Sequence, residues 1–215
     1  MSSFTDYLKT DYATHFGVTW DDSIMSIRLE IPSSIRFEIE DKKVDIVQPN
    51  GQGVSVLRRP ADAVEVVDLE DFTKKVHGEN DTPSSCDFAI SPCIGTDFLL
   101  LNELTRTKSD YIRPFVQPQT GIVKEGKLET AKQQLVSTIN RLYEGSNFCD
   151  SFVSRVAIFS CRLSDKNKNG IMARSAKSFN KSIYKLQRMR LHETLPHGFV
   201  FEMRVYDQEF RIRTT

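Results

Sequence analysis

The chain has 215 residues, of which 39% are hydrophobic and 27% charged, and its formal net charge is zero. That length fits one domain, or one domain with a short appendage, whose core is large enough to fold without disulfides. The neutral balance argues against a protein that coats nucleic acid by charge alone. The chain has no run of about eighteen apolar residues and no N-terminal secretory signal, so we expect no membrane contact and a cytoplasmic location.

The cysteines give little support to a disulfide framework or a zinc site. They are irregularly spaced, at Cys86, Cys93, Cys149 and Cys161. A zinc site that used them with His192 and His197 would normally be anchored by a Cys-x2-Cys pair, which the chain lacks. Buried, reduced thiols are the better interpretation.

The first third of the chain predicts strands followed by a short helix. An amphipathic helix near Phe4 is the clearest feature of the first thirty residues. Alternation over residues 35–39, a turn at 41–43 and an extended run over 44–47 predict a hairpin in which Glu38 faces away from the apolar side. Residues 51–60 read as a Gly-rich loop. Residues 64–67 predict a strand, after which Asp68 is placed to cap a helix from Leu69.

The rest of the chain predicts a sheet flanked by helices. Residues 86–90 and 97–104 are strands, and the second is apolar enough for a central strand covered on both faces. A polar connection over 105–126 follows, then a helix over 127–143, a strand over 155–163, a helix over 173–191 and a closing strand over 199–213. We therefore predict a mixed α/β fold, with an extension of residues 1–59 packed on a core of residues 60–215, in a single domain overall.

Two acids stand where core strands should be apolar. Asp87 opens the first central strand, and Glu103 ends the apolar run of the second. A buried carboxylate without a partner is costly, so such acids usually face a cation or a hydrogen-bond donor. Two carboxylates at adjacent ends of neighbouring strands would make an oxygen-rich pocket suited to Mg²⁺, or to Mn²⁺. The alternative is that Asp87 caps a strand and Glu103 lies at an exposed strand end.

With these acids in place, the sequence resembles the PD-(D/E)XK superfamily of nucleases. The resemblance covers roughly residues 60–163. It rests on Asp87 in Cys-Asp-Phe-Ala-Ile, on Glu103 in Leu-Asn-Glu-Leu-Thr, and on the helix that begins near residue 127. It implies a restriction-endonuclease-like core, with Asp87 and Glu103 as metal ligands. It also implies that a Gln of the helix lies near the site, and Gln134 matches best.

The chain departs from the superfamily pattern at one position. The pattern requires a lysine two residues after the glutamate, where this chain has Thr105, which can donate a hydrogen bond but carries no charge. Lys132 is our first candidate for a lysine relocated to the helix, because it lies near the sheet-facing side; Arg106 and Lys108 are alternatives. A further acid often joins the metal in this superfamily; Glu65, Asp68 and Glu70 are the candidates, and the sequence does not choose between them.

Residues 162–190 are strongly basic, with a single acid, Asp165. The predicted helix in this region places a basic stripe on one face, made by Arg174, Lys177, Lys181, Lys185 and Arg188. Such a stripe can contact nucleic-acid phosphates, although most basic helix faces are simply solvated.

The leading expectation is a metal-dependent nuclease that hydrolyses phosphodiester bonds in DNA or RNA, in microbial or mobile-element defence. This biological setting comes from the resemblance. The alternative is a catalytically inactive nuclease-fold module that serves a larger complex as a nucleic-acid- or protein-binding subunit. A plain α/β interaction protein is a third reading. The sequence leaves open the substrate, the partner subunits and the oligomeric state, including a homodimer.

Overall fold

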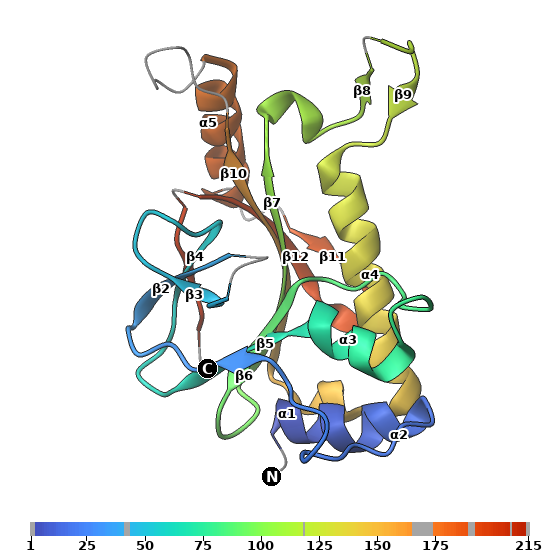
Figure 1. The fold of residues 1–215 in the computed structure, drawn as a ribbon. Coiled ribbons are helices and arrows are strands. Elements are labelled where there is room, and N and C mark those ends of the chain that lie inside the picture. Colours follow the sequence, from blue (N-terminus) through green and yellow to red (C-terminus); the bar gives the residue numbers. More distant parts are fainter. Residues whose placement is uncertain are drawn as a thin grey trace.

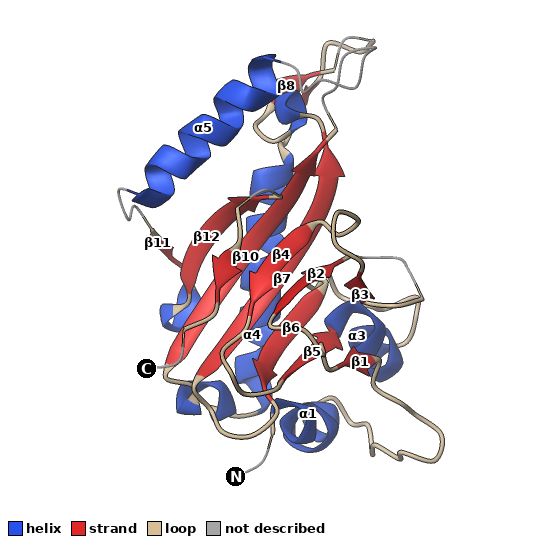
Figure 2. Ribbon diagram, turned by 90° about the vertical axis from the view of Figure 1, so that its left-hand side faces the viewer, coloured by secondary structure: helices blue, strands red, loops and turns tan. Residues whose placement is uncertain are grey.

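A seven-stranded mixed sheet forms the centre of the chain (Figures 1 and 2). The computed structural model describes residues 3–40, 44–117, 119–164, 174–188, 192–206 and 208–213. The sheet consists of β1 (Leu29–Glu30), β5 (Val64–Asp68), β6 (Phe88–Pro92), β7 (Phe98–Thr107), β10 (Ser154–Leu163), β12 (Val200–Val205) and β11 (Glu193–Thr194), in that spatial order. Neighbouring strands are antiparallel, except that β10 runs parallel to both β7 and β12.

Helices cover one face of this sheet. They are α1 (Phe4–Tyr7), α2 (Ala13–His15), α3 (Leu69–His77), α4 (Lys127–Gly145) and α5 (Arg174–Arg188), with a π-helical segment, Leu8–Tyr12, between α1 and α2. The main core lies between these helices and the sheet. The mixed α/β fold predicted from the sequence is confirmed, and so is the helix over residues 127–143. None of the helices in the described part of the chain is long and apolar enough to cross a membrane.

A second, four-stranded sheet packs on the opposite face (Figure 1). Its strands, in spatial order, are β13 (Phe210–Arg211), β4 (Ser55–Arg58), β2 (Arg36–Ile39) and β3 (Val47–Gln48). The predicted hairpin is present as β2 and β3. Because β13 pairs with β4, the N-terminal extension and the end of the chain share this sheet. The sheet also explains why residues 98–101 are apolar without alternation, since β7 is covered on both faces.

Several sequence predictions were wrong at this second sheet. Residues 51–60 contain strand β4 rather than only a loop. The closing strand over 199–213 is two strands in two different sheets, β12 and β13. Glu38 was expected to face away from the apolar side but is fully buried. Its carboxylate accepts 3.0 Å hydrogen bonds from the backbone N–H groups of Gly51 and Gly53, and a 3.1 Å bond from Tyr206 Oη, so donors replace the lost water.

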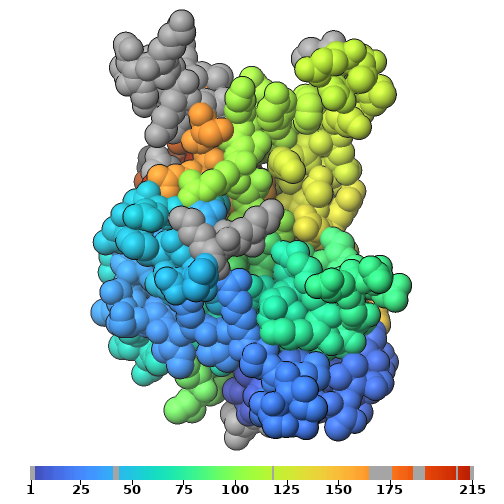
Figure 3. All heavy atoms as spheres, viewed as in Figure 1, coloured from blue at the N-terminus to red at the C-terminus, as the bar shows by residue number. Residues whose placement is uncertain are grey.

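The connection between β7 and α4 has structure of its own. Strand β7 continues to Thr107, and the hairpin of β8 (Phe115–Val116) and β9 (Val123–Lys124) stands out from the body of the protein (Figures 1 and 3). The long polar loop predicted over 105–126 is therefore partly ordered. At the other end of the core, Asp68 caps α3 as predicted, since its side chain accepts a 2.9 Å hydrogen bond from the N–H of Asp71.

Candidate functional site

The two predicted acids lie opposite each other on neighbouring strands. The antiparallel register of β6 and β7 pairs Phe88 with Asn102, and one further step places Asp87 opposite Glu103. Directly opposed residues have Cβ atoms about 5 Å apart. The carboxylate of Asp87 accepts a 2.6 Å hydrogen bond from the backbone N–H of Leu104, which fixes the orientation of its side chain. The sequence therefore predicted correctly that the two carboxylates lie on neighbouring strands, but Glu103 is inside β7, which continues to Thr107, and not at a strand end.

Both acids line a hollow of about 480 Å³ between β7, α3 and α4. We call it the acid hollow and define it by Asp87, Glu103, Thr105, Lys127 and Gln134, all of which line it. Glu103 is only 7% exposed. Register pairs Glu103 with Phe159 of β10, so its side chain is on the sheet face that α4 covers. The first two turns of α4 form one wall of the hollow.

The acid hollow contains both signs of charge. Glu70 and Lys74 also line it and form a 2.6 Å ion pair within α3. Burial, and then the negative charges of Glu103 and Asp87, raise the pKa of the Cys86 thiol. Cys86 therefore stays protonated and is unsuited to be a nucleophile or a metal ligand. The four cysteines are free thiols.

The donor set of the acid hollow suits a hard divalent cation only in part. The described residues contain no cluster of three or more His, Cys, Asp or Glu side chains placed to hold a metal. Asp87 and Glu103 supply two carboxylates, and Ser85 and Thr105 add hydroxyl oxygens at the lining. Mg²⁺ commonly binds through one or two carboxylates and completes its coordination with water and substrate phosphate. Asp87 and Glu103 thus fit a magnesium site that the substrate would complete.

Thr105 and Gln134 lie where the sequence predicted them. Thr105 lines the acid hollow two residues beyond Glu103, in the place where the superfamily has its lysine. Gln134 lines the hollow from α4, and its Nε2 donates a 3.5 Å hydrogen bond to the carbonyl of Ser85. Neither side chain brings a positive charge to the acids.

Lys132 lies elsewhere. It forms a 2.5 Å ion pair with Glu193 of β11, and its ammonium group lies 5.2 Å from the centre of the Phe201 ring. It lines a separate, mostly apolar cavity of about 220 Å³. A helix turns about 100° per residue, so a side chain near the edge of the apolar stripe can face either flank of the helix. The side chain of Lys132 lies on the flank of α4 that faces β12. The alternative Arg106 is bound to Glu40, at 2.8 Å.

Glu65 also lies outside the acid hollow. It is a buried residue of β5, and its carboxylate accepts a 3.3 Å hydrogen bond from the N–H of Thr5 and a 3.1 Å bond from Ser91 Oγ. Asp68 is occupied as the cap of α3. Of the three upstream acids considered from the sequence, Glu70 alone lines the hollow.

Sequence reasoning missed Lys127. This residue begins α4 and lines the acid hollow, where it can supply the positive charge that Thr105 lacks. The sequence had no signal that selects Lys127, because the long connection between β7 and α4 leaves the start of the helix unplaced relative to the acids.

The basic stripe is partly described. Lys177, Lys181 and Lys185 are exposed on α5. Arg174 and Arg188 belong to the same helix, but their side chains lie outside the described part of the chain. Of the α5 side chains that the structure describes, none lines the acid hollow. The stripe is therefore a surface separate from the two acids.

No protein-family model, curated protein or solved structure matches this chain.

Proposed function

We propose that this chain is a metal-dependent nuclease whose reaction takes place in the acid hollow. The observation that carries the proposal is the placement of Asp87 and Glu103 opposite each other on central strands of a helix-covered sheet, in one hollow that Lys127 also lines. Substrate phosphodiesters in DNA or RNA would be met in the cytoplasm, as the sequence predicts. The exposed lysines of α5 would contact the phosphate backbone outside the hollow.

Each residue of the hollow has a part in this reaction. Asp87 and Glu103 would hold Mg²⁺ or Mn²⁺, which when bound activates water and neutralises charge on the phosphodiester. Lys127 would offset the negative charge that develops on the phosphate oxygens. Thr105 and Gln134 would orient water or substrate through hydrogen bonds. The hydrogen bond from the N–H of Leu104 keeps the Asp87 carboxylate in place before any cation binds.

The test is cleavage of labelled DNA and RNA, single- and double-stranded, in Mg²⁺, in Mn²⁺ and in EDTA. The wild type should cut at least one substrate in a metal-dependent way. Asp87→Ala and Glu103→Ala should each abolish cleavage, because each removes a ligand of the cation. Glu129→Ala is the matched control, since Glu129 is an exposed carboxylate of α4 that does not line the hollow.

Two results would contradict the proposal. One is cleavage that survives in both carboxylate variants, which would assign it to another site or a contaminant. The other is a well-folded wild type that cuts none of the substrates in either metal. The second result would favour the alternative, a catalytically inactive module that binds nucleic acid or a protein partner.

A further inference from the structure

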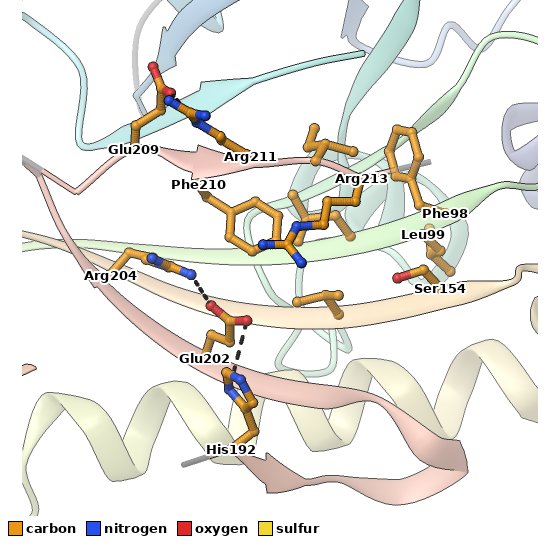
Figure 4. A pocket seen from close by; sticks show the side chains of 13 residues that line it. Phe98, Leu99, Ser154, His192, Glu202, Arg204, Glu209, Phe210, Arg211 and Arg213 are labelled. Atoms are coloured by element: carbon orange, nitrogen blue, oxygen red, sulfur yellow. Dashed lines mark hydrogen bonds and ion pairs between the residues drawn. The ribbon is translucent and has the colours of Figure 1, made fainter. Parts of the chain in front are cut away.

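A second pocket lies on the sheet face opposite the acid hollow. It encloses about 430 Å³ between β12 and the C-terminal segment that carries β13 (Figure 4). The two pockets are on opposite faces because side chains alternate along a strand. On β7, Glu103 faces α4, whereas Phe98 and Leu100 face the second sheet and line this pocket. A ligand here would not touch Asp87 or Glu103.

Charged groups from two directions meet in this pocket. Glu202 and Arg204 project from β12 and form an ion pair, and Nδ1 of His192 lies 3.8 Å from the other oxygen of Glu202 (Figure 4). Phe210 and Arg213 extend into the same space from the C-terminal segment. The cationic side chains that line the pocket therefore outnumber the anionic ones.

Two of the cationic groups can receive a ligand: Arg204, through a buried donor, and Arg213, whose side chain is exposed to solvent. Nε of Arg204 is buried and has no hydrogen-bond partner among the described residues. Arg213 forms no ion pair with any carboxylate in the described part of the chain, whereas Arg211, two residues earlier, is bound to Glu209 at 3.3 Å. A buried donor without a partner destabilises the fold, because it has lost its hydrogen bonds to water. An anion in the pocket would satisfy Arg204 Nε and pair with Arg213 together.

The walls of the pocket are aromatic and aliphatic. The guanidinium of Arg204 lies 5.2 Å from the centre of the half-buried Phe210 ring, and Phe98 and Val156 form the floor. Planar aromatic ligands stack on such rings, and volumes of about 300–1,000 Å³ are usual for small-molecule sites. Glu202 can accept hydrogen bonds from ribose hydroxyls or from amino groups of a base.

We propose that this pocket binds a nucleotide, with its phosphate on Arg204 and Arg213 and its base against Phe210. The phosphate accounts for the unused buried donor of Arg204, and the base accounts for the apolar wall. The same chemistry is offered by a free nucleotide and by one nucleotide of a single strand. The proposal does not depend on nuclease activity, because it involves neither of the acids.

The test is calorimetric titration in EDTA, which removes divalent cations and so prevents cation-dependent cleavage. The probes are AMP, GMP, adenosine, inorganic phosphate and a single-stranded DNA pentanucleotide. AMP or GMP should bind, and Arg213→Gln should weaken binding roughly tenfold or more, since a charge-assisted hydrogen bond to phosphate is lost. Phe210→Ala should weaken nucleotide binding and leave that of inorganic phosphate unchanged. Lys124→Gln is the matched control, because Lys124 is an exposed cation of β9 that does not line the pocket.

The probes distinguish a free nucleotide from one nucleotide of a single strand. They also define the results that would contradict the proposal. A pentanucleotide that binds more tightly than AMP, with both weakened by Arg213→Gln, would assign the pocket to a strand; the reverse order would assign it to a free nucleotide. The proposal fails if no nucleotide or pentanucleotide binds at millimolar concentration. It also fails if Arg213→Gln and Lys124→Gln have equal effects, or if phosphate alone binds as well as AMP. A thermal unfolding curve for each variant confirms that the fold is intact.

Discussion

Lys127 and Lys132 are five residues apart on one helix, yet the structure gives them different surroundings. Lys127 lines the acid hollow, and Lys132 is paired with Glu193 on the other flank of α4. Sequence periodicity favoured Lys132 because it lies close to the apolar stripe. Which flank of the stripe faces the acids depends on how α4 is rotated against the sheet, and that is a property of packing.

This difference predicts unequal effects of two matched substitutions. In the proposed reaction, Lys127→Ala should lower kcat roughly a hundredfold, because a charge aimed at the transition state is lost. Lys132→Ala should leave kcat within about twofold, because that lysine serves a partly exposed ion pair. Steady-state cleavage rates of both variants provide the measurement. Equal losses, or a greater loss for Lys132→Ala, would contradict the role given to Lys127.

Glu65 predicts a pH-dependent stability. Burial raises the pKa of its carboxyl group, and the hydrogen bonds from Thr5 and Ser91 offset only part of that rise. A raised pKa in the folded state means that Glu65 favours folding most at low pH, and that this contribution is lost as pH rises through the folded pKa. Glu65→Gln should therefore raise the Tm near neutral pH by about 3 °C, since no charge is then buried.

Below about pH 4 the Glu65→Gln variant and the wild type should unfold at nearly the same temperature, because Glu65 is then neutral in both states. Thermal scans across this pH range test the expectation. Glu129→Gln, at an exposed position of α4, should show no such pH-dependent difference. A Glu65→Gln protein that is less stable than wild type at neutral pH would argue that the charged form of Glu65 is stabilised in the fold.

At the scale of elements, the position of α4 decides the shape of the acid hollow. Gly126 is the N-cap of α4, with an extended backbone (φ −81°, ψ 157°) that any residue can adopt. A Cβ added there would overlap the backbone of Ile112 and Arg113. Glycine is needed at this point because the preceding loop passes directly over the start of the helix. The close approach holds the first turn, with Lys127, at the hollow.

Gly126→Ala should therefore lower stability by about 2–3 kcal/mol and reduce cleavage through a displaced Lys127. Gly121→Ala is the control. Gly121 has a positive φ of 66° but open space around its Cβ position, so alanine there should cost about 1 kcal/mol, from conformation alone. Denaturant unfolding of both variants distinguishes the two mechanisms. An equal loss of stability in the two variants would show that contact with the loop does not restrict residue 126.

At the scale of the whole molecule, a buried polar cluster joins the two sheets. Nδ2 of Asn102 on β7 donates a 2.9 Å hydrogen bond to Ser55 Oγ on β4, and Ser160 Oγ on β10 donates a 2.9 Å bond to Asn102 Oδ1. The two serine hydroxyls are also 2.9 Å apart. All three residues are at most 3% exposed. The cluster fixes how the small sheet sits on the large one, because buried polar groups tolerate few other arrangements.

Asn102→Ala should lower the free energy of unfolding by about 2–3 kcal/mol, since two buried hydrogen bonds and packing volume are lost together. Ser160→Ala should cost about 1 kcal/mol, and the double variant should cost less than the sum, with a coupling of about 1 kcal/mol. Urea unfolding of the wild type, the two single variants and the double variant measures this coupling. Asn140→Ala, at an exposed position of α4, is the matched control. Additive effects would argue that the cluster does not act as a unit.

Local features of the sequence predicted most of the elements. The apolar run of residues 98–101, the alternation of residues 35–39 and the stripe of α4 each reflect burial of one or two faces of a strand or helix. Buried positions recur at a regular spacing along the sequence, so apolar residues mark them. Asp68 was predicted as a helix cap because capping involves only neighbouring residues. The sequence did not predict that the closing segment over 199–213 forms two strands. Residues 210–211 belong to a different sheet because they pair with β4, which is far away in the sequence.

The sequence by itself determined the mixed α/β class, the central strand and the placement of Asp87 and Glu103 on neighbouring strands, because strands joined by a short connection are usually neighbours. Only the tertiary structure decided that Glu65 is bound to Thr5 and Ser91, that Lys127 rather than Lys132 lines the acid hollow, and that Arg204 and Arg213 line a second pocket. Each of these depends on contacts between segments distant in the chain. Such contacts are set by how whole elements pack, and no short stretch of sequence records that packing.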